Sequence, residues 1–409
     1  MVSRRLFLKS GGAAMFTLGF APSFLARAAE AAGARPRLLI AIFQRGAVDG
    51  LNMVIPYGEA DYYRLRPTIA IPRPGGAGAA IDLDGFFALH PSMAPLKPLW
   101  DNRTLAIVHA CGSPDVTRSH FDAQDYMETA TPGVKSTRDG WLNRVLQAGL
   151  KPDTTPDNPL RAVALSRQMP RAMQGRAPTL AFGSLAEFTV RGGAAAQQAL
   201  EAEYASDPLL GASAEDAFEA MRVLRALPPD NGPENGAEYP RSPFGQALRE
   251  IARLAKADVG LEIAFTDTGN WDHHAAEGGV TGLLASRLDD FSTGSAALVA
   301  DLGERRMADT VIVTMSEFGR TVAENGTRGT DHGHGNAMFA IGGAIKGGQV
   351  RGRWPGLGEG ARFEGRDLAV TTDFRDVFGE IVSRQLNLGP DALARVFPGR
   401  TATASVGLV

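Results

Sequence analysis

The segment LEIAFTDTG (residues 261–269) has the pattern of a buried strand that ends in a polar turn. It is followed by GLLASRLDDFSTGSAALVADLGER (282–305), which is predicted to be helical, and then by DTVIVTMSEFGR (309–320), which begins as a second apolar strand. A strand, a helix and a strand in this order predict one β-α-β unit. Its two strands should lie parallel in a single sheet.

Other segments extend this unit into a larger α/β fold. Short apolar runs that predict further strands lie at 35–44, 104–111, 161–166, 178–183 and 338–345. Helical patterns dominate residues 184–260 and return at 374–386. We therefore predict an α/β fold with a central, mostly parallel sheet and helices on both faces. It should form one domain at residues 29–409, with a helical insertion at about 184–260.

The first 28 residues have the pattern of an export signal. The pair Arg4-Arg5 precedes a Gly-rich apolar stretch at 11–25, and Ala-Arg-Ala at 26–28 offers a small-x-small cleavage site. This pattern is typical of a twin-arginine signal peptide. An amphipathic helix or membrane anchor is the alternative, but the apolar stretch is short for a membrane span. We expect export of the folded chain to the periplasm or medium, and no membrane span in the mature chain.

Charge and cysteine content narrow the range of partners. Removal of residues 1–28 takes away four positive charges and no negative ones, so the formal net charge changes from −3 to −7. A mildly acidic protein is not suited to nucleic acid, and we expect no such partner. The single cysteine, Cys111, excludes an intramolecular disulfide.

Polar residues gather directly after the predicted strands. Ligands of open α/β sheets lie at the carboxyl ends of the strands, so these loops are where a site is expected. Five of the seven histidines fall in three of the four loops. The polar residues are Asp49 in the first loop; Ser119, His120, Asp122 and Asp125 in the second; Asp272, His273 and His274 in the third; and Glu317, Asp331, His332 and His334 in the fourth.

Each of these groups also has a purely structural interpretation. The alternatives are a turn residue for Asp49, a helix N-cap for Ser119, a helix N-terminus for Asp272 with its two histidines, a local ion pair with Arg320 for Glu317, and an Asx-type turn for the stretch from Asp331 to His334. The sequence alone leaves these alternatives open.

Taken jointly, the carboxylates and imidazoles are the ligand types that suit a divalent cation. Without thiolates they favour borderline to hard ions, namely zinc, manganese or calcium. Such an ion polarises a phosphate or sulfate oxygen and activates water or a hydroxyl group. Metal-free acid–base catalysis by histidine and aspartate is the alternative. The expected ligands, in varying subsets, are Asp49, Asp272, His274, Glu317, Asp331, His332 and His334.

In their order along the chain, these residues resemble a twin-arginine-exported bacterial family catalogued as domain of unknown function 1501. That family is a relative of the sulfatase/alkaline phosphatase superfamily. The stretches that carry the resemblance are VDGLNMVIPYGEADYYRLRPTIAI (48–71), SHFDAQDYMETATPG (119–133), DGWLNR (139–144), NWDHHA (270–275), SEFGRTVAENGTRGTDHGHGNAMFAIGGAIKGG (316–348) and DLAVTTDFRDVFGEI (367–381). They span nearly all of the mature chain.

The resemblance to the superfamily implies roles for several of these residues. Asp49 matches its first metal aspartate, and Ser119 or Thr117 falls where its nucleophile lies. Asp272 with His274 resembles a later metal pair, and His332 or His334 resembles the final histidine. His120 is then an acid, a base or an anion holder, and Arg118 or Arg45 holds an anionic oxygen of the substrate.

The chain departs from the superfamily pattern after the strand VIVTM. Ser-Asp-His-Gly is the expected continuation, whereas this chain has Ser-Glu-Phe-Gly at 316–319. Glu317 can replace an aspartate ligand, but Phe318 cannot replace a histidine. Either Asp331-His332 folds back to fill the gap, or a second metal is missing. The chain also lacks the Cys/Ser-x-Pro-x-Arg signature of formylglycine sulfatases.

Three functions remain open from the sequence. The first is a periplasmic, metal-dependent hydrolase acting on a small-molecule phosphate or sulfate ester. The second is a non-catalytic metal- or partner-binding module in an exported complex, since the family resemblance implies another exported protein as partner. The third is metal-free hydrolysis through Ser119, but no G-x-S-x-G elbow surrounds this serine.

Overall fold

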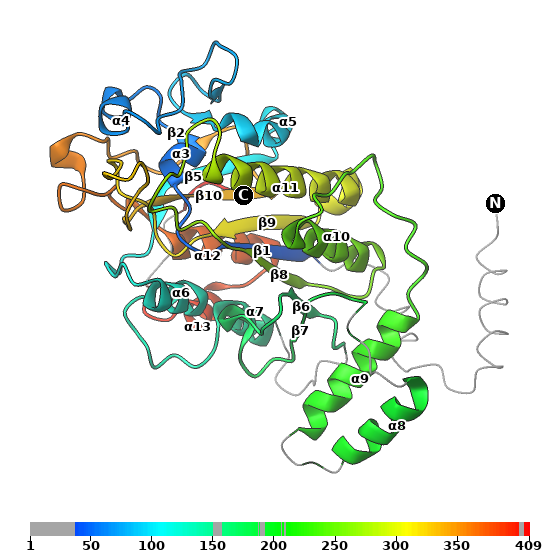
Figure 1. Cartoon of the computed structure of the whole chain (residues 1–409). Helices are drawn as coiled ribbons and strands as arrows, with labels where there is room; N and C mark the ends of the chain where they lie inside the picture. The colour runs from blue at the N-terminus through cyan, green and yellow to red at the C-terminus, as the bar shows by residue number, and fades with distance from the viewer. Residues whose placement is uncertain are drawn as a thin grey trace.

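The computed structural model describes residues 37–149, 158–186, 188, 193–205, 207, 210–400 and 405–409. Within these residues, one large sheet has the strand order β11-β5-β10-β9-β1-β8-β6-β7, and β12 also pairs with β5 (Figure 1). The strand bounds are β1 Leu38–Gln44, β5 Leu105–Gly112, β6 Ala162–Leu165, β7 Leu180–Phe182, β8 Ile263–Thr268, β9 Thr310–Met315, β10 Asn336–Gly342, β11 Val350–Arg351 and β12 Thr372–Asp373.

The sheet is mostly parallel, as predicted, because only the two pairs made by β10 are antiparallel. The strands β8 and β9 flank the helix α11 (Leu283–Met307) and form the predicted β-α-β unit. They are not adjacent, however. Leu39 of β1 pairs with Ile263 of β8 on one side and with Val311 of β9 on the other.

The reversed strand β10 determines which loops meet. Ala340 of β10 lies opposite Val313 of β9 and Ala106 of β5 in antiparallel register. Because β10 is reversed, its amino end lies at the edge where the parallel strands have their carboxyl ends. Residues 329–335, which precede β10, therefore reach the same edge of the sheet as the loops after β1, β8 and β9.

The strand β1 is buried along its whole length. Its alternate side chains pack into two different apolar cores: Leu38, Ile40 and Ile42 on one face of the sheet, and Leu39, Ala41 and Phe43 on the other. Continuous burial of this kind is typical of a parallel sheet that is covered on both faces.

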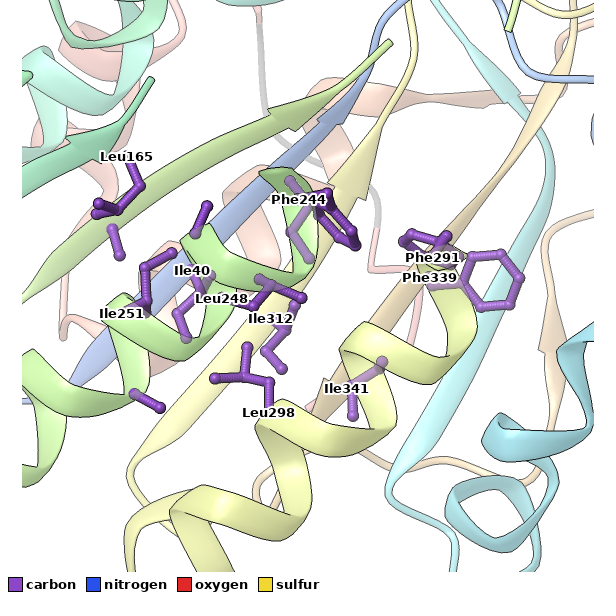
Figure 2. Packing of buried hydrophobic residues seen from close by; sticks show 14 of the residues in the cluster. Ile40, Leu165, Phe244, Leu248, Ile251, Phe291, Leu298, Ile312, Phe339 and Ile341 are labelled. Atoms are coloured by element: carbon purple, nitrogen blue, oxygen red, sulfur yellow. The ribbon is translucent and has the colours of Figure 1, made fainter. Parts of the chain in front are cut away.

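Helices cover both faces, as predicted. On one face, α10 (Pro243–Lys256) and α11 pack against the sheet, and Figure 2 shows Leu248 and Leu298 of these helices beside Ile40 and Ile312. On the other face lie α7 (Trp141–Ala148), α12 (Phe374–Gln385) and α13 (Pro390–Val396), where the Trp141 and Phe378 rings stack with centroids 4.3 Å apart.

The predicted helical insertion contains three helices that differ in placement. The helices α8 (Gly193–Tyr204) and α9 (Gly211–Arg225) lie side by side and extend away from the sheet (Figure 1), although Ala220 and Val223 of α9 join the core that covers it. In contrast, α10 is part of the layer that covers the sheet. Residues 187, 189–192, 206 and 208–209 of this stretch lie outside the described residues.

Short elements complete the described part of the chain. They are α3 Gly50–Met53, α4 Ala60–Leu65, α5 Lys97–Asp101, α6 His120–Thr129, the 3₁₀ helices η1 Pro91–Leu96, η2 Arg171–Met173 and η3 Glu359–Ala361, and a small antiparallel sheet of β2 Val54–Ile55, β4 Ala88–Leu89 and β3 Ile81–Asp82. Among the described residues, no helix is long and apolar enough to cross a membrane. The predicted signal peptide at residues 1–28 lies outside the described residues.

Candidate metal centre

The buried Arg320 ties three loops together at the carboxyl edge of the sheet. Its guanidinium donates to the carbonyl oxygens of Ala47 (2.6 Å), Trp271 (3.1 Å) and Thr330 (3.3 Å) and to the carboxylate of Asp272 (2.6 Å). These acceptors lie after β1, after β8 and before β10. Burial alone raises the pKa of the Asp272 carboxyl, but the hydrogen bond and charge of Arg320 hold it below its usual range.

Three imidazoles and one carboxylate face each other around this anchor. Nε2 of His332 lies 3.0 Å from Nε2 of His120 and 3.0 Å from Nε2 of His274. Oδ1 of Asp272 lies 2.9 Å from Nε2 of His274 and 3.3 Å from Nε2 of His332. Oδ2 of Asp272 lies 3.5 Å from Nε2 of His120. The second, third and fourth loops of the sequence analysis therefore converge here.

The other ring nitrogen of each histidine is already occupied. The donor–acceptor pairs are His120 Nδ1 to Glu317 Oε1 at 2.8 Å, His274 Nδ1 to Asp331 Oδ1 at 3.1 Å, and His332 Nδ1 to the Arg118 carbonyl oxygen at 2.8 Å. A neutral imidazole has one N–H, so in the neutral rings these bonds leave a lone pair on Nε2. The hydrogen bond to Glu317 raises the pKa of His120 and so favours a positive charge at this position. Lone pairs 3.0 Å apart repel each other unless a positive charge lies among them.

A metal cation fits this arrangement better than a proton does. A proton bridges two of these atoms, whereas a metal ion accepts electron pairs from three or four. His120, Asp272 and His332 offer ligand atoms that all lie within 4.8 Å of one another. His274 shares two of these residues, because its Nε2 lies 2.9 Å from Asp272 and 3.0 Å from His332. An acceptor on the outer nitrogen of each histidine is the usual arrangement around a protein metal.

His274 lies beside this group of three. Two ligands of one zinc ion lie at most about 4.4 Å apart, because each lies about 2.0–2.2 Å from the ion. Nε2 of His274 lies within this limit of both Asp272 (2.9 Å) and His332 (3.0 Å), but His274 is not grouped with His120. Its side chain is 45% exposed. His274, oriented by Asp331, therefore lies on the exposed flank of the group, and its role as a metal ligand stays a prediction.

Glu317 lies behind His120. Its buried carboxylate accepts hydrogen bonds from His120 Nδ1 (2.8 Å), the backbone N–H of Gly46 (2.8 Å) and Nε2 of Gln124 (2.9 Å). Burial raises the pKa of Glu317, but these hydrogen bonds outweigh burial and hold the pKa below its usual value. Glu317 was expected either as a ligand or as the ion-pair partner of Arg320. The structure instead places it as the acceptor that orients His120.

The segment before β10 folds back over Phe318. Gly319 N–H donates to the carbonyl oxygen of His334 at 2.9 Å, and Gly333 N–H donates to that of Gly319 at 2.8 Å. The Phe318 ring centroid lies 4.9 Å from the His120 ring and 5.1 Å from the His332 ring. Of the two alternatives raised by the sequence, the structure favours the one in which His332 folds back to supply a histidine.

Asp49 is not brought to this cluster. Its carboxylate forms a two-pronged ion pair with the guanidinium of Arg66, in which Nη2 donates to Oδ1 at 3.0 Å and Nη1 donates to Oδ2. Oδ1 also accepts from the N–H of Leu51, which makes Asp49 the N-cap of α3. Both partners are fully buried. The buried Asp49 carboxylate also acts on Glu277, because burial and the neighbouring Asp49 charge raise the pKa of Glu277 well above its usual value. These contacts give Asp49 a structural role, and its expected role as a metal ligand stays a prediction.

Ser119 and the two candidate arginines also have structural partners. Ser119 is the N-cap of α6, where its Oγ accepts from the N–H of Asp122 at 3.5 Å. Arg118 forms ion pairs with Asp367 (2.6 Å) and Glu364 (2.7 Å).

Arg45 is paired in the same way, with Asp267 at 2.6 Å and Glu128 at 2.8 Å. Each of the two candidate arginines thus faces two carboxylates. Their positive charges are balanced within the protein and are not held free for an anionic ligand.

Of the two histidines in the fourth loop, His332 belongs to the site and His334 lies outside it. The His334 ring stacks on Phe363 with centroids 4.6 Å apart, and burial lowers the pKa of this imidazole. It is absent from the group formed by His120, Asp272 and His332. The sequence identified His120 as a catalytic residue only. A sequence signal for its position does exist: His120 directly follows Ser119, the N-cap of α6, and is therefore the first residue of that helix.

The fold and this cluster define a class: an α/β protein with a candidate metal site of histidine and aspartate at the carboxyl edge of a mostly parallel sheet. The model of the family described as Protein of unknown function (DUF1501) matches residues 36–378. The chain belongs to this family, as its sequence resemblance predicted. No curated protein matches the chain significantly.

Three solved structures resemble the fold at low sequence identity. The C-terminal periplasmic domain of EcEptC from Escherichia coli, in complex with Zn, has a TM-score of 0.34 at 10% identity over 76% of this chain and 73% of that chain. The PsFucS1 sulfatase from Pseudoalteromonas sp. has a TM-score of 0.41 at 13% identity, over 95% of this chain and 77% of that chain. The phosphonate monoester hydrolase of Agrobacterium radiobacter has a TM-score of 0.33 at 11% identity, over 89% of this chain and 78% of that chain. The case for a function rests on the geometry of the site.

Proposed function

We propose that this chain is a metal-dependent hydrolase of a phosphate or sulfate ester, with His120, His332 and Asp272 as its protein ligands. The observation that carries the proposal is the tautomer pattern. Glu317 and the carbonyl of Arg118 occupy the outer nitrogens, so the Nε2 lone pairs of His120 and His332 face each other beside the Asp272 carboxylate. Three protein ligands leave a coordination position for water or substrate, which is typical of catalytic zinc sites.

Zinc is the ion that this donor set favours among zinc, manganese and calcium. Two imidazole nitrogens and one carboxylate match the His₂-carboxylate sites of zinc hydrolases. Calcium takes six to eight oxygen ligands, and only Asp272 of this group supplies oxygen. Manganese prefers carboxylate and water to imidazole. We infer a zinc site in which imidazole dominates.

The surrounding residues position the ligands before any substrate is present. Glu317 orients the His120 ring, the Arg118 carbonyl orients the His332 ring, and Arg320 fixes one oxygen of Asp272. Zinc bound there would polarise an ester oxygen and lower the pKa of a water molecule. Ser119 precedes His120 directly, and its exposed hydroxyl is the nearest candidate nucleophile in sequence; its N-cap bond is long, at 3.5 Å.

We also propose export by the twin-arginine route and a periplasmic or secreted location. The support is the Arg4-Arg5 motif with its apolar stretch and small-x-small site. Export in the folded state is compatible with a metal centre that is assembled from three distant loops, because such a site forms only when the chain has folded.

A second candidate function is a non-catalytic metal-binding module with an exported protein as partner. The observation that favours it is the pairing of Arg45 and Arg118, each with two carboxylates. A phosphate or sulfate hydrolase commonly holds its anionic substrate with free guanidinium groups. In this protein the metal itself would have to attract the anion.

Metal analysis of the purified protein tests the site. We expect about one zinc per chain, lost on His332→Ala or His120→Ala. His334→Gln is the matched control, because His334 lies two residues from His332 and outside the ligand group. Retention of zinc in His332→Ala, or its loss in His334→Gln, would contradict the assignment.

Turnover separates the two functions. The zinc-loaded protein is given aryl phosphates, phosphodiesters and aryl sulfates, and product release is measured. Hydrolysis that disappears in His332→Ala supports the hydrolase. One zinc per chain without turnover of any of these esters supports the non-catalytic module.

A further inference from the structure

A large aromatic side chain stands in solvent beside the proposed metal centre. Phe121 follows the ligand His120 directly and is 91% exposed, far more than the other exposed large apolar residues of the described chain. Burial of a phenylalanine side chain contributes about 1.5–3 kcal/mol, and this ring forgoes that contribution. It is not needed for the core, because the apolar contacts of α6 are made by Ala123, Tyr126 and Met127 on other sides of the helix.

Two further exposed apolar side chains come from the segments next to Phe121. They are Val116, 52% exposed, and Val134, 44% exposed. Lys135, next to Val134, pairs with Asp122 of α6, where its Nζ lies 2.8 Å from the carboxylate. The two segments also lie close to each other, because a Cβ added to Gly133 would lie 3.3 Å from Oδ2 of Asp115. We call Val116, Phe121 and Val134 the apolar rim.

The apolar rim is connected to the metal centre through the backbone. Arg118, which lies between Val116 and Phe121, offers its carbonyl oxygen to Nδ1 of His332 at 2.8 Å. Phe121 is one peptide bond from His120, whose Nε2 lies 3.0 Å from that of His332. Val116 and Phe121 thus lie within two residues, along the chain, of the two residues that contact His332.

The charged side chains near Phe121 are paired within the protein, so they do not form a second binding group for a charged ligand. The guanidinium of Arg118 is paired with Asp367 and Glu364, and the ammonium of Lys135 with Asp122. Beyond the metal, the surface around His120 therefore presents an apolar ring and balanced ion pairs. A substrate with several charged groups gains nothing here, whereas an apolar group gains contact area with the ring.

We propose that Phe121 contacts the alcohol portion of the ester, that this portion is apolar, and that Val116 and Val134 add apolar surface on the segments next to it. The proposal rests on the proposed function, because it places the anionic group of the same ester at the metal centre. It assigns the substrate class as monoesters of apolar alcohols or phenols, and it excludes polyanionic esters such as nucleotides. Phe121 is then the residue that determines specificity.

Binding of matched small anions to the zinc-loaded protein tests the proposal. Phenyl phosphate is compared with methyl phosphate, and phenyl sulfate with methyl sulfate, by calorimetry with Ser119→Ala protein if turnover interferes. We expect the wild type to prefer the phenyl member of one pair by about tenfold or more, which corresponds to about 1.4 kcal/mol. Phe121→Ser should reduce that preference to about twofold or less, and Phe121→Tyr should restore it.

Zinc content, measured on every variant, separates this specificity role from damage to the metal centre. Leu210→Ser is the matched control, because Leu210 is an exposed large apolar residue (51%) at the start of α9, outside the apolar rim. It should keep both zinc and the phenyl preference. Phe121→Ser should keep zinc and lose the preference alone.

Three results would overturn the proposal. Equal affinity of the wild type for phenyl and methyl members shows that the ring does not contact the ligand. A phenyl preference that persists in Phe121→Ser, with a changed oligomeric state, makes the ring an interface between protein chains. No binding of any of the four anions to zinc-loaded protein defeats the proposed function as well, which distinguishes it from the first two results.

Discussion

At the scale of single residues, the site depends on carboxylates that do not bind the metal. Glu317 and Asp331 each accept a hydrogen bond from an Nδ1–H group, of His120 and of His274 respectively, and in this way they determine that Nε2 is the free nitrogen of each ring. Residue types indicated that these carboxylates and imidazoles act together. The division into ligands and orienting partners could not be predicted, since it depends on which atoms of distant loops come within about 3 Å.

Glu317→Gln tests the orienting role. The amide keeps the size of the side chain but loses the negative charge that holds the His120 N–H, so zinc affinity should fall about 10–100-fold. Competition with a chelator measures the affinity. Asp331→Asn is the comparison, and it should weaken zinc less, because His274 lies outside the ligand group. A larger effect of Asp331→Asn would make His274 a principal ligand.

For Asp49 we predict an effect on folding stability, whereas for the ligands we predict an effect on zinc binding. Asp49→Asn leaves the buried guanidinium of Arg66 without its counter-charge. Loss of one partner of a buried ion pair typically costs about 3–5 kcal/mol of folding free energy. Urea denaturation should show this loss, while the folded variant keeps its zinc. If the variant instead lost zinc with unchanged stability, Asp49 would be a ligand after all.

At the scale of elements, strands and their polar ends were more predictable than strand order. The apolar runs at 261–269 and 309–315 predicted β8 and β9 well, because buried parallel strands are apolar on both faces. That β1 lies between them, and that β10 runs in reverse, depends on pairing between segments far apart in the chain. The reversal of β10 is what brings His332 to the site.

The close approach of two segments before β10 needs glycine. A Cβ added to Gly333 would lie 2.3 Å from the carbonyl carbon of Arg320. Gly333→Ala should therefore push the His332 segment away, cost about 1–3 kcal/mol of stability and weaken zinc binding. Gly326 is the control, since an added Cβ there meets nothing within 4 Å. Thermal unfolding and chelator competition on both variants check this; an unchanged Gly333→Ala protein would refute the packing argument.

At the scale of the whole molecule, the two sheets are joined by a buried histidine. Nε2 of His109, on β5 of the large sheet, donates to the carbonyl oxygen of Val54 on β2 at 3.0 Å, and Nδ1 accepts from the N–H of Ala110 at 2.9 Å. Both nitrogens have the partners of a neutral ring. Complete burial lowers the pKa of His109 to about 4, although the hydrogen bond to Val54 and the charge of Asp49 oppose the shift.

This depressed pKa predicts acid sensitivity with a defined sign. Above about pH 6.5 the ring is neutral in both folded and unfolded chains, so it contributes no pH dependence. Between about pH 6.5 and pH 4 the unfolded chain binds a proton that the folded chain rejects, so folding stability falls. Below about pH 4 the loss levels off at about 3 kcal/mol, because the pKa of the ring is about 4 in the folded chain and about 6.5 in the unfolded chain.

Comparison with His109→Gln isolates this contribution from the many carboxylates that also titrate. Glutamine can donate to Val54 but does not ionise in this range. Urea denaturation at pH 7 and at pH 4.5 gives the stability lost on acidification for each protein. The wild type should lose about 2–3 kcal/mol more than the variant, since only its unfolded state gains the His109 proton. Equal losses in the two proteins would mean that His109 already carries its proton in the folded state, and the link between the two sheets would then be charged.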